Sequence, residues 1–164
     1  MQKPGPKLAD GRTAEIYAWG NDQIVKLYRE GWTRGTAEFE YRQALASQQT
    51  GYRVPHVEQV IELDGRIGII YQRVDGPTML GVLRQKLFRF PQFARQMADL
   101  HAEMHTKTAR DLEPVHERLA GKIAAVADFS EAEKNALHTR LFQLPQEDKL
   151  LHGDFHPDNI LLTG

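Results

Sequence analysis

Residues 152–159 of this 164-residue chain read His152-Gly153-Asp154-Phe155-His156-Pro157-Asp158-Asn159. Two imidazoles, two carboxylates and a carboxamide fall within eight residues, a density of functional side chains that folding alone rarely needs. The β-type runs 149–151 and 160–162 flank the segment, so we expect a loop between two short strands. Phosphoryl transfer needs this kind of pairing, in which one carboxylate serves as base for the attacking hydroxyl and a neutral amide oxygen binds magnesium. Asp154 and Asn159 are the candidates for these two roles.

The segment resembles the catalytic loop of the aminoglycoside phosphotransferase and choline kinase family, which reads H-G-D-x-H-x-x-N. Every fixed position of that pattern is present. Protein kinases carry the related loop H-R-D-L-x-x-x-N, with the same spacing from Asp to Asn. The resemblance implies that Asp154 is the catalytic base, Asn159 a Mg²⁺ ligand and His152 a structural member of the loop. It also implies ATP and Mg²⁺ as cofactors and a hydroxyl of a small molecule as acceptor.

Upstream of this loop, residues 7–74 show mostly strand patterns. Runs 14–19 and 24–28 flank a turn signal at 20–22 and predict a hairpin. A helical period follows over residues 33–49. Runs 57–63 and 66–74 flank Asp64-Gly65, which suits a two-residue hairpin turn. The predicted order is strand, strand, helix, strand, strand.

After the breaker Asp75-Gly76-Pro77 the pattern becomes helical. Thr78 can cap a short helix to about residue 86, Pro91 opens a longer one, and two more are expected over residues 115–128 and 130–144. The fold class is therefore α+β. By the resemblance it is protein kinase-like, with a small antiparallel sheet lobe carrying one helix (1–74), a hinge (75–77) and an incomplete, mostly helical C-terminal lobe (78–164).

A candidate phosphate-binding lysine, Lys26, lies in the strand-like run 24–28, where the family places the lysine that neutralises the α and β phosphates. Kinase-like sites pair this lysine with a glutamate of the following helix. Glu40 is the preferred partner because it stands at helical spacing from Ala37 and Ala44. Glu38 remains the alternative.

Two further segments complete the expected nucleotide site. The loop 9–14 should cover the phosphates with backbone N–H groups, and its central residues are Gly11, Arg12 and Thr13. The resemblance also implies an adenine-binding hinge, in which the Gln72 carbonyl and the Val74 N–H meet the base. Both segments would act through their backbone, so their side chains carry little information.

Two other patterns suggest metal binding. His101 and His105 lie four positions apart on a predicted helix, and a packed or interfacial histidine pair is the preferred interpretation because H-E-x-x-H is not formed. Alternatively, four residues at every second position could ligate a transition metal in a metal-dependent hydrolase. These residues are His152, Asp154, His156 and Asp158. That alternative requires a regular strand, which Gly153 and Pro157 disfavour.

Composition limits the other classes of function. The net charge of −1 offers no excess of cations for nucleic acid, and the absence of cysteine excludes disulfides and thiolate sites. The N-terminus lacks an apolar signal region and no stretch is long enough to span a membrane, so we expect a cytoplasmic protein.

The C-terminal end of the sequence raises a further expectation. The resemblance implies a second metal-binding aspartate after the strand that follows Asn159, and the sequence stops at Thr163-Gly164 before it. We therefore expect the 164-residue chain to transfer phosphate weakly or not at all, and a non-catalytic nucleotide-binding or interaction module is the alternative. A strand at residues 160–162 with an unpaired edge predicts self-association.

Overall fold

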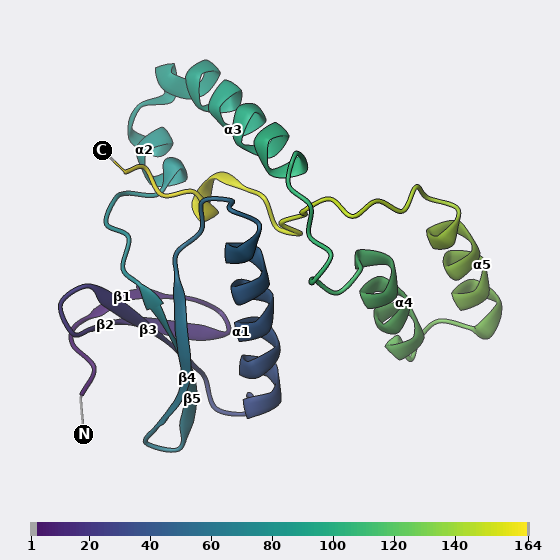
Figure 1. Ribbon diagram of the computed structural model, residues 1–164, viewed down its shortest axis with the longest axis horizontal. Helices are drawn as coiled ribbons and strands as arrows, with labels where there is room; N and C mark the ends of the chain where they lie inside the picture. The colour runs from purple at the N-terminus through teal and green to yellow at the C-terminus, as the bar shows by residue number, and fades with distance from the viewer. Residues whose placement is uncertain (1–2, 164) are drawn as a thin grey trace.

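The computed structural model describes residues 3–163 and contains a five-stranded antiparallel sheet (Figure 1). The strands lie in the spatial order β1, β2, β3, β5, β4. Their bounds are Lys7–Asp10, Ala14–Trp19, Gln23–Tyr28, Arg66–Gln72 and Val57–Leu63, respectively. The four predicted strands are present, and β5 ends two residues earlier than expected. β1 is an additional strand that we did not predict, because all four of its residues are exposed and its sequence lacks a buried face.

The single helix of this part, α1 (Arg34–Gln49), packs on one face of the sheet (Figure 1). The Thr33 side chain caps it by accepting a hydrogen bond from the Thr36 N–H. The core between α1 and the sheet contains buried Ala14, Tyr28, Ala37, Val57 and Ile69. The opposite face of the sheet carries a second cluster, which contains buried Trp19, Val25 and Ile70. Because side chains alternate along β3, Val25 belongs to the far face and Lys26 projects toward α1.

The β4–β5 hairpin has the predicted two-residue turn. Asp64 and Gly65 have φ values of 49° and 75°, and two successive positive φ angles are characteristic of the turn that matches the twist of paired strands. In the sheet, β5 lies between β3 and β4. β5 ends at Gln72, shortly before the predicted hinge at residues 75–77.

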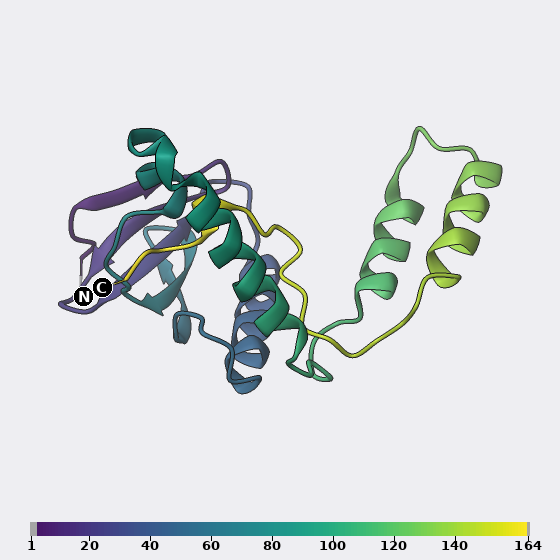
Figure 2. The same ribbon diagram turned by 90° about the horizontal axis from the view of Figure 1, so that it is seen from above.

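Helices follow from residue 79 onward: α2 (Met79–Gln85), α3 (Phe90–His105), α4 (Val115–Ala125) and α5 (Glu131–Phe142), with short 3-10 turns at Leu87–Arg89 and Pro157–Asn159. Thr78 caps α2, and Ser130 forms a capping box with Glu133 on α5. Figure 2 shows α4 and α5 as a hairpin that stands apart from the sheet. Both helices are fully described by the structure, and no residue of either is buried.

The two segments around residues 152–159 are not strands, contrary to our prediction. Lys149 forms only an isolated bridge with Thr108, and Leu161 forms one with Thr78. One edge of the segment 160–162 is occupied, because the Met79 N–H donates to the Ile160 carbonyl at 2.8 Å and the Leu162 N–H to the Pro77 carbonyl at 2.9 Å. The expected strand at residues 160–162 is therefore wrong, and Gly164 lies outside the described residues.

Gly76 allows this contact between the hinge and the segment after the loop. Its φ is 157°, and a Cβ atom there would lie 2.3 Å from the Leu162 carbonyl oxygen. We expect Gly76→Ala to lower the free energy of unfolding by about 2 kcal/mol or more, because a backbone atom must move. Gly121→Ala is the control: a Cβ there meets nothing within 4 Å, and the change should stabilise α4 by about 0.5–1 kcal/mol. Urea unfolding measures both, and equal effects would contradict the prediction.

Among the residues described, no helix is long and apolar enough to cross a membrane.

Candidate functional site

Lys26 and Glu40 form an ion pair between the sheet and α1. The Lys26 Nζ lies 2.6 Å from Glu40 Oε1 and 2.8 Å from Glu40 Oε2. The alternative partner, Glu38, lies instead near Arg34, with 3.7 Å between the charged atoms. Successive helix residues are rotated by about 100°, so Glu38 and Glu40 project in nearly opposite directions, and the packing of Ala37 turns Glu40 to the sheet. The structure thus brings together the preferred pair.

Two tyrosines hold the same carboxylate, and sequence analysis did not single them out. The Tyr28 hydroxyl donates to Glu40 Oε2, and the Tyr71 hydroxyl donates to Glu40 Oε1 at 3.0 Å. Burial of both phenols, and the adjacent Glu40 carboxylate, raise the pKa of each hydroxyl well above its usual value. Both therefore remain protonated donors. The sequence did contain a signal for Tyr28. Residues two apart on a strand share a face, so Tyr28 is expected on the same face of the sheet as Lys26.

The tyrosine hydrogen bonds should contribute measurably to stability. Hydrogen bonds to a charged group contribute about 1.5–3 kcal/mol, and we expect the lower end because 36% of the Glu40 side chain is exposed. Tyr28→Phe and Tyr71→Phe should therefore each lower the free energy of unfolding by about 1.5 kcal/mol in urea titrations. Tyr41→Phe serves as control, because its hydroxyl reaches only the exposed Glu58 carbonyl at 3.4 Å. Losses no larger than that of the control would contradict this role.

The environment of Glu40 also predicts a pH dependence of stability. Burial by itself would raise the pKa of this carboxyl, but the Lys26 charge and the hydrogen bonds from Lys26, Tyr28 and Tyr71 outweigh burial and lower it. A carboxyl whose pKa is lowered by folding stabilises the protein above its unfolded pKa. This contribution disappears as the pH falls from about 4.5 through the lowered folded value. Glu40→Gln should therefore flatten the loss of stability in that window, measured by urea unfolding against pH, whereas Glu38→Gln should leave the slope unchanged.

The predicted phosphate-covering loop is the tight turn between β1 and β2, and it contains only three residues. The Gly11 N–H donates to the Ala14 carbonyl at 2.9 Å, so this group is engaged within the turn. The Arg12 and Thr13 N–H groups donate no hydrogen bond to residues 3–163. Arg29 fixes the turn by donating to the Gly11 carbonyl at 3.0 and 3.2 Å and by pairing with Asp10. The free N–H groups are therefore those of Arg12 and Thr13.

At the end of β5 the backbone N–H groups of Gln72 and Arg73 are occupied, and that of Val74 has no acceptor among the described residues. The Gln72 N–H donates to the His56 carbonyl at 2.7 Å, and the Arg73 N–H donates to the Asp22 carbonyl at 2.8 Å. The Val74 N–H donates to no residue from 3 to 163. Arg73 also holds Asp75, with 2.7 Å between Nε and Oδ1. Val74 is thus free to bind a ligand while its neighbours are fixed.

Asp154 and Asn159 lie together, as their spacing predicted. The Asn159 Nδ2 donates to the Asp154 carbonyl oxygen at 2.9 Å and approaches Asp154 Oδ2 at 3.4 Å. The Asn159 Oδ1 accepts no hydrogen bond from the described residues, so it is available as an oxygen ligand. The Asp154 side chain is 75% exposed, which leaves its carboxylate open to a substrate hydroxyl.

The remaining residues of the loop hold its shape. The Thr78 hydroxyl, which caps α2, also donates to Asp158 Oδ1 at 2.9 Å, so the loop is attached to the start of that helix. His152 Nδ1 accepts the Asp154 N–H at 3.2 Å, and burial lowers the pKa of His152. Gly153 has a φ of 79°, a conformation that a glycine adopts without strain.

Neither metal interpretation is supported by the geometry. Within residues 3–163 no group of three or more His, Asp or Glu side chains could hold a metal ion. The four alternating residues 152, 154, 156 and 158 do not share a face, because the chain turns at Gly153 and forms a 3-10 turn from Pro157. His101 is exposed, but its ring stacks on Phe155 of the loop with 5.0 Å between ring centroids and lies 4.2 Å from the ring of His105.

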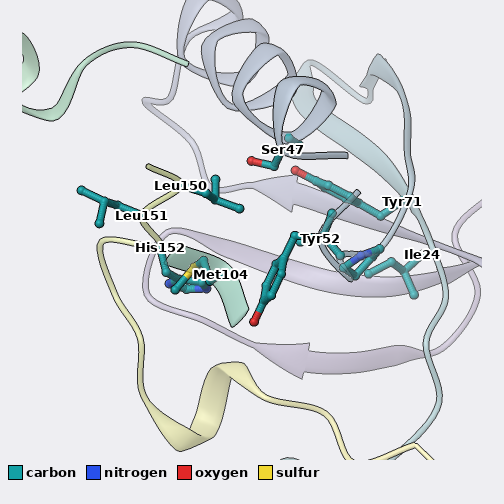
Figure 3. Close-up of a pocket in the computed structure, with 11 residues that line it drawn as sticks. Ile24, Ser47, Tyr52, Tyr71, Met104, Leu150, Leu151 and His152 are labelled. Atoms are coloured by element: carbon teal, nitrogen blue, oxygen red, sulfur yellow. The ribbon is translucent and has the colours of Figure 1, made fainter. Parts of the chain in front are cut away.

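A mostly apolar cavity of about 290 Å³ lies between the sheet, α1 and the start of the loop (Figure 3). Tyr71, which binds Glu40, forms one part of its wall, and His152, which begins the loop, forms another. The rest of the wall comprises Ile24 of β3, Met104 of α3, Leu150 and Leu151 before the loop, and residues of α1 and of the segment before β4. Tyr71, the partner of Glu40, and His152 of the loop therefore share one cavity, whereas Lys26, Glu40, Asp154 and Asn159 do not line it.

A lysine–glutamate pair between an antiparallel sheet and its helix, together with an H-G-D-x-H-x-x-N loop, defines a phosphotransferase of protein kinase-like fold. The family model described as "Phosphotransferase enzyme family" matches residues 5–164. The chain belongs to this family.

Solved structures share the fold. The GDP and kanamycin complex of APH(2")-IIia matches with a TM-score of 0.57 and 16% identity, over 99% of this chain and 63% of that one. The GDP complex of wild-type aminoglycoside 2'-phosphotransferase-IIIa matches with a TM-score of 0.53 and 15% identity, over 99% and 62%. The chain thus spans less than two thirds of the length of these structures. No curated protein matches the sequence.

Proposed function

We propose that this chain contains the nucleotide-binding part and the catalytic loop of an ATP-dependent phosphotransferase that acts on a hydroxyl of a small molecule. The observation that carries the proposal is the Lys26–Glu40 ion pair, whose partner Tyr71 shares the wall of one cavity with His152 of the loop. Phosphoryl transfer requires a cation at the nucleotide phosphates and a base at the acceptor hydroxyl. In this proposal residues 1–74 and 78–164 are the two lobes, and 75–77 is the hinge.

Each residue of the proposed site has a distinct task. Lys26, held by Glu40, neutralises nucleotide phosphates, and the free N–H groups of Arg12 and Thr13 next to Gly11 cover them. The Gln72 carbonyl and the Val74 N–H meet the adenine edge. In the neighbouring structures the nucleotide is GDP, so guanine is the base to compare with adenine.

The Asn159 Oδ1 fits one ligand of Mg²⁺, since amide oxygens suit this hard cation. A bound Mg²⁺ would supply positive charge to the phosphates. Asp154 orients the acceptor hydroxyl and accepts its proton, for which its exposed carboxylate is well placed. The Asn159 amide, by donating toward Asp154, holds that carboxylate within the loop.

The test is a thermal melt of the 164-residue chain with ATP or GTP, with Mg²⁺, and with nucleotide and Mg²⁺ together. A nucleotide at one hundred times its Kd should stabilise the folded state by about 2.7 kcal/mol if it binds only that state. Stabilisation that requires Lys26 supports the proposed site. The absence of any shift with either nucleotide contradicts it.

Turnover is measured separately, as ADP formation that depends on a hydroxyl compound. Nucleotide binding without turnover by the 164-residue chain would favour the non-catalytic nucleotide-binding module. Robust Mg²⁺-dependent phosphorylation of a small alcohol would instead show that residues 1–164 are sufficient for the reaction.

A further inference from the structure

Arg118 of α4 lies against the catalytic loop without a partner for its charge. Its Nη2 is 3.4 Å from the position that a Cβ atom of Gly153 would occupy, one residue before Asp154. Its Nε is buried and makes no hydrogen bond to any residue from 3 to 163. No carboxylate of these residues lies within 4.0 Å of its guanidinium nitrogens, whereas Arg66, Arg73 and Arg110 are all paired.

This position leaves one donor of Arg118 unsatisfied by the described protein atoms, although the residue as a whole is only half-buried. An unsatisfied buried donor costs about 1–3 kcal/mol, and the cost is larger for a charged group. A guanidinium presents its donors in a planar fork that matches the two oxygens of a carboxylate or a phosphate. Because Gly153 has no side chain, the guanidinium approaches the loop at this residue, and an anion bound to it would lie beside the part of the loop that precedes Asp154.

A second buried side-chain atom without a partner among the described residues belongs to His105 of α3. The His105 Nε2 is buried and has no hydrogen-bond partner among the described residues. His105 packs on His101, which stacks on Phe155, the residue after Asp154. The part of the chain that the structure describes has only these two buried side-chain atoms without a partner, and both adjoin the elements that support the loop.

We propose that Arg118 determines acceptor specificity by binding an anionic group of the acceptor, a carboxylate or a phosphate, while the acceptor hydroxyl lies at Asp154. The inference rests on the proposed function and names the substrate class: hydroxy compounds that carry an oxyanion. The positive charge of Arg118 disfavours acceptors whose ammonium groups would lie at the same position. Compounds such as kanamycin, present in the neighbouring complex, are therefore poor acceptors for this site.

The direct probe is the Nε–H resonance of Arg118 in proton–nitrogen NMR spectra of the full chain, assigned by its loss in Arg118→Lys. Glycerate, glycerol 3-phosphate, glycerol and choline are titrated at constant ionic strength. Glycerate or glycerol 3-phosphate should shift this resonance in a saturable way. The compound with the higher affinity shows whether the site prefers a carboxylate or a phosphate. Glycerol and choline should leave it in place. An equal response to glycerol, or a response to MgATP alone, would overturn the inference.

Variants separate recognition from structure. Arg118→Gln should weaken binding of the responding anion at least about tenfold, while Arg118→Lys should retain part of it because the charge remains. Arg140→Gln on α5 is the matched control, since Arg140 is exposed and has no carboxylate partner among residues 3–163; its affinity should equal that of the wild type. Unchanged affinity in Arg118→Gln would contradict the inference, and the melting curves of all variants show whether each is folded.

The thermal shift with MgATP is recorded on the same samples. A MgATP shift without any Arg118 response to the anions overturns the specificity assignment and leaves the proposed function intact. An Arg118 response without a nucleotide-dependent shift overturns the proposed function, and the acceptor role of Arg118 with it.

Discussion

Asp154→Asn is expected to lower turnover about 10²–10⁴-fold while nucleotide affinity stays nearly unchanged. The substitution keeps the size of the side chain and removes its ability to accept the hydroxyl proton. The Asp154 carboxylate contacts only Asn159 and His156 within the described residues, at 3.4 and 3.5 Å, so the loop should not depend on its charge. Steady-state rates measure turnover, and the thermal shift with MgATP measures nucleotide affinity. Both measurements are made on a form of the protein that catalyses the reaction.

The matched control changes the other carboxylate of the same loop. In Asp158→Asn the amide oxygen can still accept the hydrogen bond that Thr78 donates to Asp158. We therefore expect the attachment of the loop to α2 to survive and turnover to fall far less than in Asp154→Asn. Unchanged turnover in Asp154→Asn would eliminate this residue as the base, and equal losses in both variants would mean that loop charge, not proton transfer, matters.

The second large effect is expected for Lys26→Ala, which should weaken nucleotide binding and lower turnover together. Lys26 lies on β3, and its ammonium group is held in the site by Glu40. Removing one group that stabilises developing charge typically lowers the rate about 10²–10³-fold. The variant also leaves the Glu40 carboxylate with only the two tyrosine hydroxyls. Nucleotide-dependent thermal shifts and steady-state rates measure both losses.

Substitutions on α1 serve as the comparison for Lys26. Glu40→Gln removes the charge that holds the lysine, so it should show a smaller loss in the same direction. Glu38→Gln should have no effect, because Glu38 is 3.7 Å from Arg34 on the exposed side of the helix. A nucleotide affinity that is unchanged in Lys26→Ala would contradict the assigned phosphate role.

Much of this fold follows from local pattern. The strands at 14–19 and 57–63, the turn at Asp64-Gly65, and the caps Thr33, Thr78 and Ser130 all depend on residues within a few positions of one another. Such features are local, because alternation, positive φ and capping act over one or two turns of chain. The proximity of Asp154 and Asn159 is local in the same sense. β1 was missed because its short exposed strand carries no such pattern.

The sequence by itself determined the fold class, the pair Asp154 and Asn159, and the candidacy of Lys26, since each depends on a contiguous motif. Only the tertiary structure decided that Glu40 and not Glu38 meets Lys26, because this depends on how α1 is rotated against the sheet. It also decided that Tyr71 completes the cluster and that Arg118 reaches Gly153. Tyr71 is 31 positions from Glu40, and Arg118 is 35 positions from Gly153. The distance between such residues depends on how whole elements pack, and no local spacing in the sequence predicts it.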